Sequence, residues 1–195
     1  EAQRLAQAGQ VIKAGKAKGE RVETLNRSAS GLADSLDTFV KRANKQINDT
    51  PRFMSLFAQA SKDISAKLRY AQRLASGGDQ QRAQADSLFL EIEGSESGIR
   101  NTSESIDGAI DEMVREMASL NVQMTAFNGM CLGGKFTVGP GDIIPDMGPC
   151  KGLIAAASRF EAVRAPMREN HERLQKTKDA AITQLESSWR AASAH

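Results

Sequence analysis

The sequence predicts an all-α protein, an elongated antiparallel bundle of three to four long helices. Apolar residues recur every seven positions over long stretches, and aromatic residues make up only 5% of the 195 residues. One stretch, Gly129 to Cys150, breaks the pattern with six of the sixteen glycines and three of the five prolines. We therefore expect a single domain over residues 1–195, with residues 129–150 as a loop between the last two helices.

The first helix is predicted from two lanes, meaning sets of residues seven apart that share one side of a helix. Three glycines weaken the helix before Glu20, so the first twenty residues are expected to fray. Asn48-Asp49-Thr50-Pro51 predicts a helix end and a new start, with Thr50 as N-cap and Pro51 in the first turn. The two lanes are Val11, Leu25, Leu32 and Phe39, and Val22, Ala29, Leu36 and Ala43.

The next helix is expected from Arg52 to about Ala75, followed by a turn at Ser76–Asp79 in which Asp79 is the N-cap. Residues 94–98 fit either a second turn or the interior of one helix. Two further lanes predict a packed helix from residue 99 to 127: Ile99, Ile106, Met113, Leu120 and Phe127, and Ser103, Ile110, Met117 and Met124. The last helix is expected from Lys151, with its apolar side formed by Ile154, Phe160, Met167, Leu174, Leu185 and Trp189.

Charge is unevenly distributed although the net charge is only +2. Residues 86–116 carry nine acids and two bases, whereas residues 56–82 and the segment from Lys151 onward are net basic. We expect helices of opposite charge to flank one another in the bundle. The small net charge predicts no nucleic-acid partner.

Cys131 and Cys150 are the only cysteines, and both lie at the ends of the loop. We expect them to form a disulfide, which places the protein outside the cytoplasm, in the periplasm, at the cell surface or secreted. Lys135–Val138, a Gly-Pro-Gly-Asp turn and Ile143-Ile144 fit a small β-hairpin. The candidate partner-binding residues of this loop are Leu132, Phe136, Val138, Ile143, Ile144 and Met147. The same side chains also fit an alternative in which the hairpin folds back and caps the bundle.

Nothing in the sequence predicts catalysis, a cofactor or a metal site. His171 is the only internal histidine, and we expect it at the edge of the core with its ring bonded to a neighbour. No apolar run approaches the length of about 18 residues that a membrane span needs.

These observations favour a non-enzymatic interaction protein that presents its loop to a protein partner or a surface receptor. Envelope assembly components, adhesins and secreted binding proteins all fit this description. The alternative is an extracytoplasmic sensor domain of a membrane receptor, whose termini an even number of helices would bring to one end. A helical protein that inserts into membranes fits less well, because the glycines and prolines of the loop suit no span. The oligomeric state is open, a homo-oligomer included.

Overall fold

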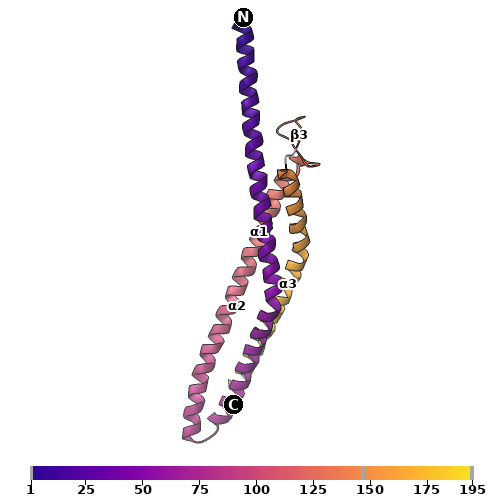
Figure 1. The fold of residues 1–195 in the computed structure, drawn as a ribbon. Coiled ribbons are helices and arrows are strands. Elements are labelled where there is room, and N and C mark those ends of the chain that lie inside the picture. Colours follow the sequence, from indigo (N-terminus) through magenta and orange to yellow (C-terminus); the bar gives the residue numbers. More distant parts are fainter. Residues whose placement is uncertain (1, 146–147, 194–195) are drawn as a thin grey trace. The chain divides into compact units, whose positions relative to one another are not determined.

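The computed structural model describes residues 2–145 and 148–193 and confirms the all-α fold class (Figure 1). Three helices dominate: α1 (Ala2–Ala75), α2 (Asp79–Asn128) and α3 (Pro149–Ser193). Three two-residue strands lie between α2 and α3: β1 (Cys131–Leu132), β2 (Lys135–Phe136) and β3 (Ile144–Pro145). They form one small antiparallel sheet in the order β1-β2-β3.

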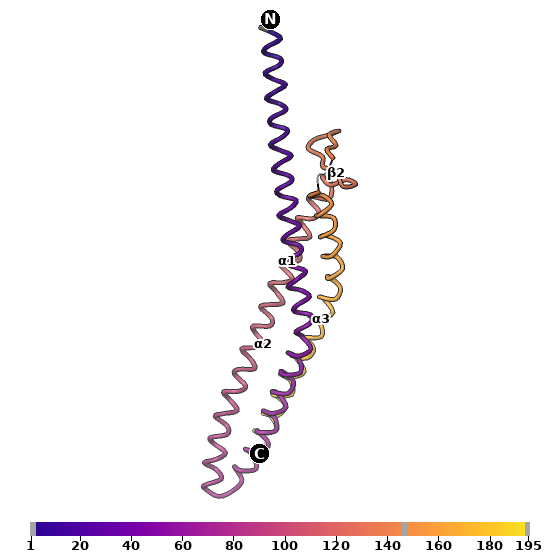
Figure 2. The backbone as a smooth tube through the Cα atoms, viewed as in Figure 1, coloured from indigo at the N-terminus to yellow at the C-terminus, as the bar shows by residue number. Residues whose placement is uncertain are grey.

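The described residues group into two compact units, and all three helices contribute to both, as the tube in Figure 2 lets the reader follow by residue number. Unit 1 contains the residues up to Ala43 together with Val114–Arg164. Unit 2 contains Asn44–Met113 and the residues from Ala165 onward. The expectation of a single domain stays a prediction.

In unit 1 the predicted lanes of α1 form the core from residue 29 onward. Leu36 and Phe39 are fully buried, and the Phe39 ring lies 5.3 Å from that of Phe160 on α3. At the edge of this contact Arg159 donates two hydrogen bonds of 2.9 Å to the carboxylate of Asp37. These bonds hold the pKa of Asp37 below its usual value.

The N-terminal end of α1 differs from both expectations for it. Val11 was predicted in a core lane but is 72% exposed, because no other described segment packs against these turns. The predicted fraying before Glu20 is also absent, since the helix begins at Ala2. Alanine, glutamine and lysine between the glycines are good helix formers, which accounts for the regular helix.

In unit 2 the core is one apolar cluster with contributions from all three helices. Polar contacts at its edge show the register of α1 and α3, which run parallel. Ser61 Oγ donates to the carbonyl of Ala181 (3.2 Å), and Gln72 Nε2 donates to the carbonyl of Ala191 (3.3 Å). The fully or nearly buried members of the cluster are Phe57, Ile64, Leu68, Ala71, Ile92, Ile99, Ala181 and Leu185.

The predicted helix break at Asn48–Pro51 is wrong, because α1 continues through Pro51. Proline removes one backbone hydrogen bond from a helix interior. Thr50, the residue before this proline, bonds both within α1 and to α3: its hydroxyl donates to the carbonyl of Gln46 (2.7 Å) and accepts from Asn170 Nδ2 of α3 (3.0 Å). Thr50 is therefore a buried link between two helices and not an N-cap.

The turn between α1 and α2 falls where it was predicted, but Asp79 is not the cap. The carbonyl of Gly78 accepts the amides of Gln81 and Arg82, each at 3.0 Å, and Gln81 Oε1 accepts the amide of Gly78 at 3.0 Å. Gly78 is therefore the N-cap and Gln81 is at N3. The bond from the N-cap amide to the N3 side chain is one of the two hydrogen bonds of a capping box. Residues 94–98 lie inside α2, which settles the open alternative.

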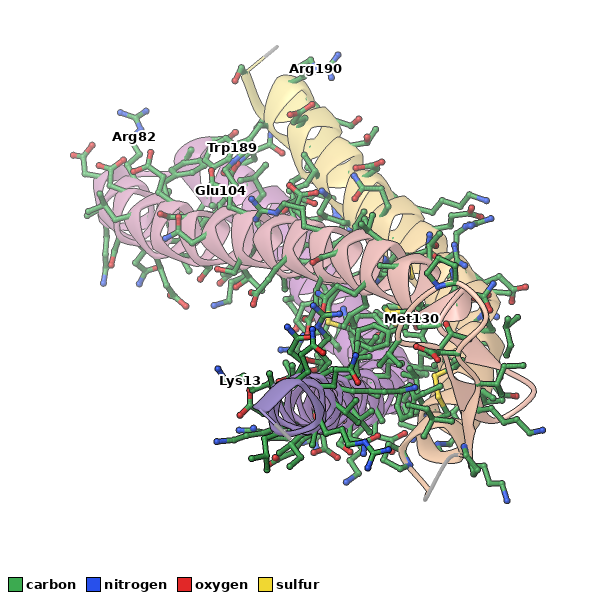
Figure 3. All side chains as sticks on the ribbon, turned by 90° about the horizontal axis from the view of Figure 1, so that it is seen from above. Lys13, Arg82, Glu104, Met130, Trp189 and Arg190 are labelled. Atoms are coloured by element: carbon green, nitrogen blue, oxygen red, sulfur yellow. A yellow bond between two sulfur atoms is a disulfide. The ribbon has the colours of Figure 1, made fainter. Side chains whose placement is uncertain are left out.

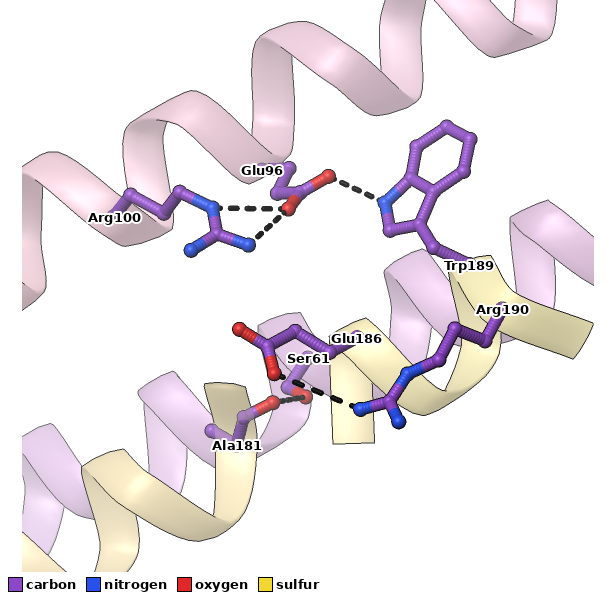
Figure 4. Close-up of polar contacts among 7 residues, drawn as sticks. All are labelled: Ser61, Glu96, Arg100, Ala181, Glu186, Trp189 and Arg190. Atoms are coloured by element: carbon purple, nitrogen blue, oxygen red, sulfur yellow. Dashed lines mark hydrogen bonds and ion pairs between the residues drawn. The ribbon is translucent and has the colours of Figure 1, made fainter. Parts of the chain in front are cut away.

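Basic side chains of α1 and α3 pair with acidic side chains of α2, as expected from the uneven distribution of charge. In unit 2 Lys67 of α1 pairs with Glu91, and Lys178 of α3 pairs with Asp107, both on the acidic stretch of α2. Figure 4 shows a further member of this stretch, Glu96, which accepts hydrogen bonds from Arg100 on its own helix and from Trp189 Nε1 on α3. In unit 1 Arg42 pairs with Glu116. In unit 2 the pairs between α2 and α3 follow opposite orders along the two helices, Glu96 with Trp189 and Asp107 with Lys178, so these helices run antiparallel.

The lanes of α2 give a matched test of this packing. Leu120 is 4% exposed in unit 1, whereas Val122, two residues further along the same helix, is 69% exposed. We expect Leu120→Asp to destabilise the protein by several kcal/mol, because it buries an unpaired carboxylate. Thermal unfolding followed by circular dichroism measures the effect, with Val122→Asp as the control of equal charge. Equal melting temperatures for the two variants would show that this lane is not part of the core.

Candidate functional site

The loop between α2 and α3 is closed by the predicted disulfide, which the structure confirms. Cys131 lies in β1, directly after the end of α2, and Cys150 lies in the first turn of α3. Their Cα atoms are 5.6 Å apart, and Cys150 is fully buried. The bond therefore holds the end of one helix to the start of the next, at the base of the loop.

Two glycine turns shape the loop above the disulfide. Gly133 and Gly134, with φ of +59° and +78°, form the two-residue turn between β1 and β2, and such a turn needs positive φ at both positions. Between β2 and β3, Pro140 and Gly141 occupy the centre of a type II turn, in which Gly141 has φ +84° and the amide of Asp142 donates to the carbonyl of Gly139 (3.1 Å).

The pairing of β2 with β3 confirms the predicted hairpin, and β1 is an addition to it. Phe136 pairs with Ile144 and Lys135 pairs with Pro145, on the two sides of the turn at residues 139–142. The third strand was missed, although Gly133-Gly134 between Leu132 and Lys135 is a recognisable hairpin signal. The result is a sheet of three strands, tied through Cys131 to α3.

The strand register divides the candidate residues between two faces of this sheet. Residues directly opposite each other share a face, so Cys131, Phe136 and Ile144 form an inner face. The outer face consists of Leu132, Lys135 and Pro145, all of which are exposed.

Phe136 is therefore misassigned as a partner-binding residue. Its side chain is 1% exposed and belongs to the interior of unit 1, because strand pairing turns it to the same face as Cys131. Ile144 and Val138 are partly buried, which also fits the capping alternative. Leu132 and Ile143 are 61% and 64% exposed and are available to a partner. Met147 lies outside the described residues.

The loop also leans against α1 within unit 1. Lys18 Nζ donates to Asp142 Oδ1 at 2.9 Å, which joins the type II turn to the helix. Below this pair a shallow groove of about 510 Å³ runs between helix and loop. Its lining consists of Ala17, Glu20, Arg21, Thr24, Leu25, Met130, Thr137 and Val138.

A second groove, of about 360 Å³, lies beside the disulfide between the end of α2 and the start of α3. Ile154 lines it and is 48% exposed, so its predicted place in the core is wrong: it faces this groove and not α1. Glu161 lies at the groove with both carboxylate oxygens bonded to Arg164 Nη1. The apolar part of the lining is Met124, Phe127, Cys131, Leu153, Ile154 and Ala157.

His171 of α3 lies at the edge of the core in unit 2, as predicted, but its ring is not bonded as expected. Nε2 is buried and has no hydrogen-bond partner among the described residues. Burial of the ring lowers the pKa of His171 below its usual value, so the neutral form is favoured.

Among residues 2–145 and 148–193, no group of three or more His, Cys, Asp or Glu side chains is placed to hold a metal ion. No helix of the same described ranges combines the length and the apolar character needed to span a membrane. Comparison of the chain with protein-family models, curated proteins and solved structures gives no match.

The burial of Phe136 predicts a role in stability. We expect Phe136→Ala to lower the free energy of unfolding by about 3–5 kcal/mol, as is typical when a buried aromatic ring is removed. Leu132→Ala, on the outer face of the same sheet, should change it by less than about 0.5 kcal/mol. Chemical denaturation of both variants measures the difference. A Phe136→Ala protein as stable as the Leu132→Ala protein would contradict the inner and outer assignment.

The lowered pKa of His171 predicts a pH dependence of stability. The unfolded chain takes up a proton near the usual histidine pKa of about 6.5, whereas the folded protein resists protonation until a lower pH. This contribution to stability is therefore complete above about pH 7 and is lost as the pH falls below about 6.5. The denaturation midpoint is measured at about pH 7.5 and about pH 5.5 for the wild type and for His171→Gln. The drop in midpoint between the two pH values should be larger for the wild type. His195 is present in both proteins, so equal falls would exclude His171 as the cause.

Proposed function

We propose that this chain is a non-enzymatic binding protein of an extracytoplasmic compartment, and that it presents the exposed apolar residues of its disulfide-closed loop, Leu132 and Ile143, to a protein partner. The observation that carries the proposal is the exposure of Leu132 and Ile143, at 61% and 64%, on a loop fixed at its base by a disulfide. Exposed loops on rigid scaffolds often carry binding. Aliphatic side chains neither hold nor move protons, which favours recognition over catalysis.

The rigidity of the loop supports the proposal energetically. The disulfide, the two glycine turns and buried Phe136 all restrict its backbone before any partner binds. Binding to a flexible loop would cost about 0.5–1.5 kcal/mol for each ordered side chain, and more for the backbone. A loop that already has its bound shape avoids much of this cost.

The disulfide also supports the proposed compartment. Such bonds persist in oxidising environments, including the periplasm, the cell surface and the medium outside the cell. An envelope assembly component, an adhesin and a secreted binding protein all work there through exposed protein surfaces. The proposal covers these three roles and is independent of the oligomeric state.

The sensor alternative gains no support from the helix count. It assumes an even number of helices, whereas the described residues contain three, and the first and last described residues belong to different units. A protein that inserts into membranes is also less well supported, because the exposed loop residues are single aliphatic side chains among glycines and prolines.

A pair of matched variants tests the proposal. Leu132→Ser with Ile143→Ser removes the exposed apolar side chains of the loop, and Val114→Ser with Val122→Ser removes two exposed valines from α2 of the same unit. We expect the loop variant to lose at least tenfold in affinity for the partner, because the contact surface is gone. The α2 variant should bind like the wild type.

The partner is first captured from extracts of the source organism by the immobilised wild-type protein and identified by mass spectrometry. Its affinity for all three proteins is then measured by surface plasmon resonance. Both variants should keep the wild-type melting temperature, since the substituted side chains are exposed. Capture of the same partner with equal affinity by all three proteins would place the binding surface elsewhere.

A further inference from the structure

The first turns of α1 form an exposed helix, here named the N-terminal helix segment and defined as residues 3–19. Every residue in it except Gly9 is exposed, and the indigo turns in Figure 2 lie beside no other helix. Leu5, Val11 and Ile12 are 71%, 72% and 71% exposed. A helix of this length extends about 25 Å. Three large aliphatic side chains are thus held in water on a well-formed helix.

These apolar side chains share one side of the segment. At 100° per residue, Leu5, Ala8, Val11 and Ile12 fall within an arc of about 120°, which also contains Arg4. Lys16 and Lys18 lie just outside the two edges of this arc, and the opposite side carries glutamines, alanines and Lys13. The segment is therefore amphipathic, with lysines flanking its apolar stripe.

The charge of the segment is of one sign only. It contains four bases, Arg4, Lys13, Lys16 and Lys18, and no acid. In Figure 3 the side chain of Lys13 points outward from the helix. An anionic surface therefore complements this segment, because it attracts a helix whose charges are all positive.

A second helix fits this segment poorly. A helix packed along the lanes of α1 would meet Arg4, Val11 and Lys18 in one lane and Ala8 and Gly15 in the other. It would bury two cations and find few large apolar side chains. A flat anionic surface fits better: the stripe enters the apolar layer, while the long lysine side chains at its edges reach up to phosphates.

We propose that the N-terminal helix segment binds the surface of an anionic phospholipid bilayer and lies in its plane. Three aliphatic side chains and four bases attach such a helix without spanning the bilayer, and the binding depends on both. Lys18 is also bonded to Asp142 in the absence of lipid. Both partners of this pair are about half exposed, so the pair does not prevent lipid contact.

The proposal is tested by sedimentation of the full chain with lipid vesicles. One set contains phosphatidylcholine alone, and the other contains about 30% phosphatidylglycerol, which supplies the negative surface potential. We expect binding to the anionic vesicles only, weakened at least tenfold by Lys13→Gln with Lys16→Gln. Leu5→Ser with Ile12→Ser should weaken it by a similar factor, since it removes the stripe.

Ala6→Ser with Ala14→Ser is the matched control, because it adds two serines to the opposite side of the same exposed helix. It should bind anionic vesicles like the wild type, and circular dichroism should show equal helix content in all variants. Absence of binding to anionic vesicles, or equal binding to both vesicle types, overturns the proposal. Sedimentation velocity without lipid tests the alternative that a second copy of this chain covers the segment. Self-association of the wild type that Leu5→Ser with Ile12→Ser abolishes would support this alternative and overturn the lipid proposal.

Discussion

The whole structure depends on the burial of apolar side chains that recur every seven residues. Isolated helices are marginal in water, so α1, α2 and α3 persist because their apolar sides pack against one another within each unit. This packing also sets the register. In unit 2, Thr50 meets Asn170 and Ser65 meets Ser188, and in unit 1 Asp37 meets Arg159. The polar pairs follow from this register, because a single hydrogen bond or exposed ion pair contributes only about 1 kcal/mol, much less than the apolar packing.

The same packing explains how so small a sheet can exist. Strands of two residues are too short to be stable alone. Here β1 continues directly from packed α2, and the disulfide joins it to the first turn of packed α3. Phe136 adds a buried ring on the inner face, and glycines supply the positive φ angles of both turns. The loop is thus an extension of the helix packing in unit 1, and its outer face is rigid for that reason.

The sequence predicted what depends on local pattern and missed what depends on distant partners. Periodicity located the core lanes, and the cysteine count located the disulfide. Val11 was placed in the core because its lane continues in sequence where no other described segment packs against it, whereas the lane of Phe160 and Met167 passes through buried Leu153 and leaves Ile154 at a groove. Thr50-Pro51 has the pattern of a helix start, whereas in the structure the helix continues and Thr50 bonds to Asn170, 120 residues away in the sequence. Phe136 and Leu132 are equally apolar, and strand register alone turns one inward and the other outward.

Both proposed surfaces belong to unit 1, and Lys18 is the residue they share. Its ion pair with Asp142 joins the N-terminal helix segment to the type II turn of the loop. A lipid phosphate that took Lys18 would release Asp142, so lipid binding and partner binding at the loop would be coupled through this pair, with equal effect in both directions. The pair is half exposed, and such pairs contribute at most about 1 kcal/mol, which limits the coupling to about fivefold in affinity. Attachment to a bilayer therefore leaves the loop nearly unchanged, because the disulfide and Phe136 hold its shape without Lys18.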